Sequence, residues 1–198
     1  MSEATPTSEA DAVLDFWFGA PGSREFGSAR KAWFSKDAAF DATIRERFGA
    51  LVERALRGEL EAWGGEPRSA LAQILLLDQF TRNAYRGTAR AFAGDARALA
   101  AASRMVGSRH DQALTPLMRA FVYLPFEHAE GLAMQDEAIR MFTKLVSDAP
   151  EHADMLDYAH RHRDVIERFG RFPHRNDVLG RQSTAEEIAF IKQPGSGF

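Results

Sequence analysis

The amino-acid sequence predicts an all-α fold, a stack of antiparallel helical hairpins with seven to nine helices. Apolar side chains recur at spacings of three and four residues along most of the chain, which is the pattern of one buried helix face. No stretch alternates between apolar and polar residues as a half-buried strand does. Medium-length helices joined by short loops pack as antiparallel neighbours. We therefore expect one helical domain over residues 8–198, after a disordered segment at residues 1–7.

Start and stop signals delimit the helices that we expect in the first half of the chain. Ser8 is a typical N-cap, because its hydroxyl can accept a hydrogen bond from the first turn, and Gly19 ends that helix. Pro67 suits the first turn of a later helix, which Gly87 ends. The expected helices cover residues 10–17, 40–56 and 67–86.

The second half carries similar signals. Asp95 is the expected N-cap of the next helix, and Thr115, which precedes a proline, starts another. Pro125 is expected to break or kink that helix. Ser183 and Glu186 form the expected capping box of a short last helix. The expected helices cover residues 95–107, 116–125, 126–146, 151–169 and a final segment that ends before residue 194.

Composition excludes several classes of function. The chain of 198 residues has a formal charge of −3 and no cysteine, so neither a basic nucleic-acid-binding surface nor any thiolate chemistry is expected. The first twelve residues are polar and acidic and do not resemble a secretory signal. The longest apolar run, residues 74–77, is far shorter than the roughly 20 residues of a membrane-spanning helix. We expect a cytoplasmic protein with no nucleic-acid or membrane partner.

Polar side chains fall on helix faces that should be buried. On the helix expected at 126–146, His128 and Gln135 lie within the apolar face and Glu127 lies at its border. On the helix that ends at residue 169, His162 lies near the centre of the apolar face and Arg163 at its margin. Burying such groups costs several kcal/mol unless they find polar partners.

Two further segments supply partners for these groups. The helix expected at 67–86 turns from apolar to polar, and its polar face carries Asp78, Arg82 and Arg86. The loop after residue 170 adds three more basic side chains and is shaped by a glycine and a proline. We expect these groups to converge on one interior pocket. Its candidate residues are Asp78, Arg82, Asn83, Arg86, Glu127, His128, Gln135, His162, Arg163, Arg171, His174 and Arg175.

A purely structural role remains open for each of these residues. Asp78 and Arg82 have the i, i+4 spacing of an ordinary helical ion pair. His128 and His162 can be core histidines with satisfied hydrogen bonds, and the arginine-rich loop can dock on helix ends. The histidines and carboxylates lack the helical spacing of metal ligands, so neither a metal nor a cofactor is predicted.

Six segments resemble a known family. They are VLDFWFG (13–19), LDQFTRN (77–83), RGTARAFAGD (86–95), YLPFEHAE (123–130), HRDVIERFGRFPHRN (162–176) and LGRQSTAEE (179–187). Together they resemble the bacterial family called domain of unknown function 924, over about residues 12–192. The resemblance implies an all-helical, tetratricopeptide-like fold. It implies no reaction.

Two hypotheses for the function use the same pocket. Guanidinium and imidazole donors favour binding of a small anionic ligand or an acidic peptide. The alternative is an enzyme that uses a histidine and a carboxylate as an acid–base pair. No nucleophile elbow, phosphate-binding loop or dinucleotide turn is present in the sequence, so no catalytic residue is assigned. A third possibility is a scaffold that binds a partner helix or tail.

Overall fold

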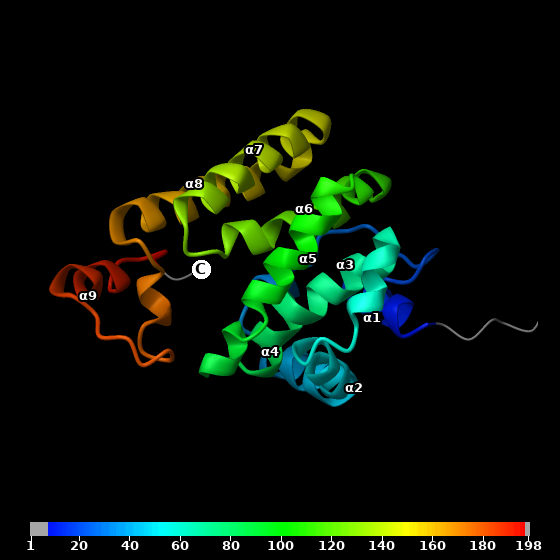
Figure 1. The fold of residues 1–198 in the computed structure, drawn as a ribbon, viewed down its shortest axis with the longest axis horizontal. Coiled ribbons are helices and arrows are strands. Elements are labelled where there is room, and N and C mark those ends of the chain that lie inside the picture. Colours follow the sequence, from blue (N-terminus) through cyan, green and yellow to red (C-terminus); the bar gives the residue numbers. More distant parts are fainter. Residues whose placement is uncertain (1–7, 197–198) are drawn as a thin grey trace, which may run out of the picture.

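The computed structural model describes residues 8–196, and these residues form helices and connecting loops without any β-strand (Figure 1). The all-α prediction is confirmed. The expectation of disorder at residues 1–7 lies outside the described residues, and the single domain stays a prediction. The α-helices are α1 (Glu9–Phe18), α2 (Ala38–Leu56), α3 (Pro67–Leu75), α4 (Thr81–Ala84), α5 (Asp95–Gly107), α6 (Pro116–Glu127), α7 (Leu132–Asp148), α8 (Ala153–Phe169) and α9 (Ala185–Ile191).

Shorter helical turns complete the chain. A π-helical turn at Leu76–Phe80 joins α3 to α4. Single 3-10 turns lie in the loops at Lys31–Trp33, Glu61–Gly65, Ala89–Phe92, His110–Ala113, Pro150–His152 and Pro173–Arg175.

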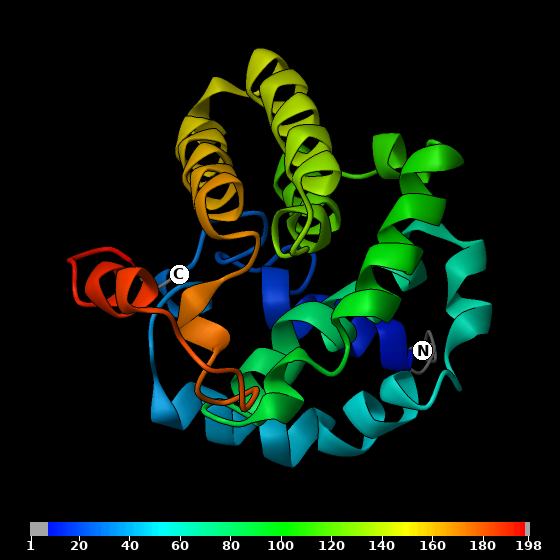
Figure 2. The same cartoon turned by 60° about the vertical axis from the view of Figure 1, so that its left-hand side comes forward.

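The helices pack largely between sequence neighbours, as expected for a stack of hairpins. Helices α5, α6, α7 and α8 contact one another in succession, and α7 and α8 form a hairpin at one end of the molecule (Figure 2). The first half is less regular, because α1 packs on α3, and α2 packs on the π-helical turn and α4. Helix α3 also contacts α5 and α6, so it lies at the centre of the fold.

An aromatic cluster joins the N-terminal helix to this centre. Trp17 and Phe80 are fully buried, with ring centroids 5.2 Å apart. Trp33 lies against Phe121 of α6 at 4.9 Å, and its indole N–H donates to the backbone oxygen of Trp17. These large rings remove much apolar surface from water, which is the main driving force for folding.

Several predicted helix ends are confirmed and others are wrong. Ser8 and Thr115 cap α1 and α6 through their side chains, as predicted. The last capping box is formed by Thr184 and Glu187, one residue later than predicted. The N-cap of α5 is Gly94, the residue before the one predicted.

Pro125 does not break its helix, which continues to Glu127 before the chain turns and α7 begins at Leu132. The helix predicted over 126–146 is therefore two helices with a turn between them. Proline is tolerated here because it lies in the last turn of α6, where it removes a single helical hydrogen bond. The side-chain amide of Gln135 donates to the backbone oxygens of Glu127 and Ala129, each at 2.7 Å, and so closes the turn.

The π-helical turn interrupts the helix that the sequence predicts over 67–86. Its wider backbone spacing brings Asp78 and Gln79 to the interior, and such turns occur frequently at functional sites. The hydroxyl of Thr81 donates to the carbonyl oxygen of Leu77 at 2.7 Å. Gly94 lies directly against the same carbonyl group, and a β-carbon there would overlap the oxygen and lie 2.9 Å from the carbonyl carbon.

We therefore expect Gly94→Ala to lower the free energy of unfolding by about 2 kcal/mol, because the added methyl group meets backbone that cannot rotate away. Urea unfolding followed by circular dichroism measures the change. Gly107→Ala, in the last turn of the same helix and with nothing near its β-position, is the matched control and should gain about 0.5 kcal/mol. Equal effects of the two substitutions would contradict the proposed contact.

Candidate functional site

A buried carboxylate at the π-helical turn holds the first part of the site together. The side chain of Asp78 is 1 % exposed. One of its oxygens accepts from His128 Nδ1 at 2.7 Å and from Arg82 Nη2 at 3.2 Å, and the other accepts from the Gln79 amide at 2.6 Å. Burial raises the pKa of Asp78, but hydrogen bonds and charge from His128 and Arg82 lower it by more, so its pKa lies well below the ordinary range.

A second carboxylate brings two arginines together. Asp95, at the start of α5, lies 3.1 Å from Arg82 Nη2 and 3.1 Å from Arg175 Nη1. The ring of Phe92 lies beside both guanidinium groups, and Phe172 covers Arg175 at 4.4 Å. Burial and the adjacent charge of Arg82 lower the pKa of Arg175 to about 10.

The two guanidinium groups carry more hydrogen-bond donors than their neighbours accept. Nε and Nη1 of Arg82 and Nε of Arg175 are buried and have no hydrogen-bond partner. An unsatisfied buried donor costs about 1–3 kcal/mol, and three of them lie on two neighbouring side chains. The adjacent Asp95 Oδ1 is also buried without a hydrogen bond, so the ion pairs here leave both donors and an acceptor unsatisfied.

A second imidazole–carboxylate pair lies beside the first. Nδ1 of His162 is 2.9 Å from Glu127 Oε1, and the rings of His162 and His128 are 6.1 Å apart. The other carboxylate oxygen of Glu127 is buried and accepts no hydrogen bond. Burial lowers the pKa of His128 below its ordinary value, although the charge of Asp78 opposes the change.

His174 contributes a third imidazole, from the loop that follows α8. Its ring lies 5.7 Å from the ring of Phe172. Burial, together with the charges of Arg175, His162 and Arg82, lowers the pKa of His174 to about 3, so this ring is neutral at physiological pH. These contacts define the polar cluster, which comprises Asp78, Arg82, Asp95, Glu127, His128, His162, His174 and Arg175.

Five of the predicted site residues lie elsewhere and have structural partners. Arg86 forms a two-pronged ion pair with Asp41 of α2, at 2.6 and 2.9 Å, and Asn83 donates to the same carboxylate at 2.7 Å. These two side chains bind α4 and the turn that follows it to α2. Gln135 closes the turn between α6 and α7, as described above, and does not join the polar cluster.

Two arginines of the prediction lie on the surface. Arg163 pairs with Asp136 and Glu167, at 2.7 and 2.9 Å. Arg171 binds Glu187 at 2.7 Å and so anchors α9. Both arginines bind acidic residues outside the polar cluster. The sequence pattern could not show that these acids, rather than the acids of the interior, are their partners.

Sequence reasoning missed Asp95, Phe92 and Phe172. The sequence pattern indicates a helix cap at Asp95, and this interpretation gives no sign of its role as the bridge between Arg82 and Arg175. The signal that could have found it is the segment at 86–95, which ends on this aspartate and is one of the six that resemble the known family.

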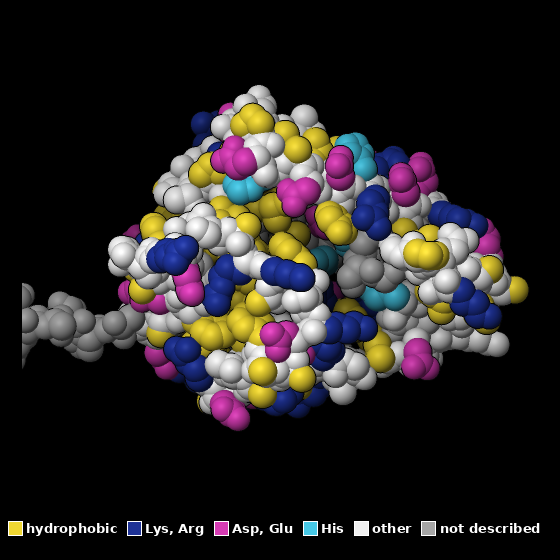
Figure 3. Space-filling view, turned by 180° about the vertical axis from the view of Figure 1, so that it is seen from behind, with side chains coloured by type: hydrophobic (Ala, Val, Ile, Leu, Met, Phe, Trp, Pro, Cys, Tyr) yellow, Lys and Arg dark blue, Asp and Glu magenta, His cyan; other side chains and the backbone are white. Residues whose placement is uncertain are grey.

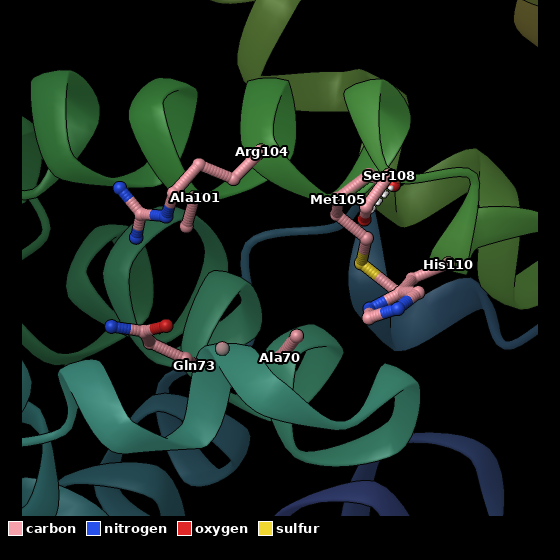
Figure 4. A pocket seen from close by; sticks show the side chains of 8 residues that line it. Ala70, Gln73, Ala101, Arg104, Met105, Ser108 and His110 are labelled. Atoms are coloured by element: carbon pink, nitrogen blue, oxygen red, sulfur yellow. Dashed lines mark hydrogen bonds between the residues drawn. The ribbon is translucent and has the colours of Figure 1, made fainter.

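The polar cluster reaches the surface through two of its members. The side chains of His128 and Arg82 are 15 % and 20 % exposed. Figure 3 shows histidine side chains in a hollow on one face, with Lys and Arg side chains nearby. A separate cavity of about 170 Å³ lies between α3 and α5 (Figure 4). It is lined by Gly64, Ala70, Gln73, Ala101, Arg104, Met105, Ser108 and His110, none of which belongs to the polar cluster.

Comparison with known proteins identifies a family but no activity. The family described as a bacterial protein of unknown function (DUF924) matches residues 13–195. The chain belongs to this family. It is also similar to the structure of a protein of unknown function from Agrobacterium tumefaciens, with 42 % sequence identity and a TM-score of 0.79. That similarity covers 92 % of this chain and 96 % of the other. No curated protein matches the chain.

Metal ligation and membrane insertion can both be judged over residues 8–196. Among these residues, no group of three or more His, Asp or Glu side chains is arranged to hold a metal ion. No helix in this part of the chain has both the length and the apolar character that crossing a membrane requires.

The lowered pKa of His174 predicts that acid destabilises the fold. The unfolded chain binds a proton at this residue near pH 6.5, whereas the folded protein does so only near pH 3. Between these values the unfolded state holds more protons, so stability falls as the pH falls, by about 1.4 kcal/mol per pH unit. We expect His174→Gln to reduce this slope in urea unfolding measured from pH 6.5 to pH 4. An unchanged slope would show that His174 titrates normally.

Proposed function

We propose that the polar cluster binds the anionic group of a small molecule or of an acidic peptide. The observation that carries the proposal is the set of three buried guanidinium nitrogens, on Arg82 and Arg175, that have no acceptor. Guanidinium groups bind carboxylate and phosphate oxygens through charge-assisted hydrogen bonds. An oxygen anion beside the two side chains would satisfy these donors.

The surroundings support such a role because they hold the donors in place. Arg175 is packed between the rings of Phe92 and Phe172, and Asp95 fixes its outer nitrogen. A guanidinium group that is already ordered loses little conformational entropy when it binds a ligand. The partly exposed side chains of Arg82 and His128 provide the route from solvent.

The binding proposal predicts that acetate or inorganic phosphate binds to the wild-type protein in isothermal titration calorimetry. Arg82→Met and Arg175→Met should each weaken this binding by about tenfold or more, because each removes charged donors. Arg86→Met is the matched control, since Arg86 lies on the neighbouring turn but is held by Asp41, and it should leave the affinity unchanged. Circular dichroism checks that the variants fold. Equal weakening by all three variants would argue against a specific site.

A second candidate function is acid–base catalysis, and a separate observation favours it. Two imidazole–carboxylate pairs, Asp78 with His128 and Glu127 with His162, lie side by side. The Asp78 carboxylate at Nδ1 of His128 fixes the tautomer of that imidazole, so its Nε2 can accept a proton. His128 would act as the acid or base, with Asp78 orienting its ring and the arginines binding an oxyanion.

This candidate predicts turnover in a screen of esters, amides and phosphate esters at neutral pH. His128→Gln should lower the rate of any reaction found by about 100-fold or more, which is the usual contribution of a general acid or base. Unfolding measurements on the same variant separate lost catalysis from lost structure. Turnover that survives in a folded His128→Gln protein would assign the reaction to other residues.

We also propose that the protein works in the cytoplasm and has no nucleic-acid partner. A chain without cysteine is compatible with a reducing compartment. A formal charge of −3 does not favour binding to the negatively charged backbone of a nucleic acid.

A further inference from the structure

The charges of the polar cluster do not suit an anion alone. Two guanidinium groups, on Arg82 and Arg175, face three carboxylates, on Asp78, Asp95 and Glu127. With the histidines counted as neutral, the formal charge of the cluster is −1. A phosphate or a dicarboxylate would therefore meet donors locally but repulsion from the site as a whole.

Glu127 shows what the other end of a ligand would meet. Its side chain is 3 % exposed, and one oxygen pairs with His162. The second oxygen, Oε2, is buried and accepts no hydrogen bond. A buried carboxylate oxygen without a donor is as costly as a donor without an acceptor. The cluster thus has unsatisfied donors at Arg82 and Arg175, an unsatisfied acceptor beside them at Asp95 Oδ1, and a second unsatisfied acceptor at the far end, Glu127 Oε2.

A continuous series of contacts connects these two ends. Arg82 binds Asp78, Asp78 binds His128, and the ring of His128 lies beside the ring of His162, which pairs with Glu127. The donors and the acceptor therefore belong to one polar region, with the imidazole rings between them. A single molecule with an anionic group at one end and a hydrogen-bond donor at the other would match this arrangement.

We propose that the ligand carries a hydrogen-bond donor, an ammonium or a hydroxyl group, in the same molecule as its anionic group. Amino acids and hydroxy acids are the matching chemical class. The inference rests on the proposed function, because the anionic end occupies the Arg82–Arg175 site. The donor end meets Glu127. An ammonium group suits this position better than a hydroxyl group, since it also compensates the excess negative charge of the cluster.

A titration series tests the inference on the wild-type protein. The probes are glycine, 3-aminopropanoate, 4-aminobutanoate and 5-aminopentanoate, each compared with the acid of equal length that lacks the amino group. The increasing lengths sample the separation between the two ends of the site. We expect at least one amino acid to bind about tenfold more tightly than its parent acid, which corresponds to one charge-assisted hydrogen bond.

Two variants locate the effect. Glu127→Gln replaces an acceptor by an amide, so the ratio of the two affinities should fall toward one. Glu130→Gln is the matched control, because the oxygens of Glu130 are already occupied by the Phe172 N–H and by Arg181, and the ratio should persist. If Glu127→Gln does not fold, as judged by circular dichroism, the wild-type series decides alone.

The outcomes separate the two proposals. Parent acids that bind as tightly as the amino acids, or a preference that survives in Glu127→Gln, would overturn the inference and leave the anion site standing. If neither the acids nor the amino acids bind to the wild-type protein, the anion site itself is wrong and the inference fails with it.

Discussion

The buried carboxylate of Asp78 is the constraint on which the site depends. An ionised group in the interior is stable only with close partners, and Asp78 obtains them from three directions. Gln79 adjoins it on the π-helical turn, Arg82 comes from the next turn, and His128 comes from the end of α6. The position of each partner is therefore coupled to the others, and the site and the core form one structure.

Much of the fold follows from local signals in the sequence. The helical stripes, and the caps at Ser8 and Thr115, lie where the sequence places them. The burial of His162 agrees with the prediction, whereas His128 is only partly buried, and for a partly different reason. It lies at the end of α6 rather than within a longer helix, and Asp78 holds its ring in place.

The partners of the polar side chains could not be predicted from the sequence. Helical periodicity indicates which face a side chain occupies, but not which acid lies opposite it. Arg82 and Arg86 share a face one turn apart, yet the first binds Asp95 and the second binds Asp41, from different helices. The π-helical turn could not be predicted either, because a single wider turn does not change the spacing of the apolar residues in a recognisable way.

The bridge between Asp95 and Arg175 spans 80 residues of sequence. A ribosome releases the chain from its N-terminus, and folding proceeds in that order. Arg82 and Asp95 are thus made long before the loop that completes their surroundings. The polar cluster is assembled last, so a nascent or truncated chain that lacks this loop has most of the helical core but an incomplete cluster.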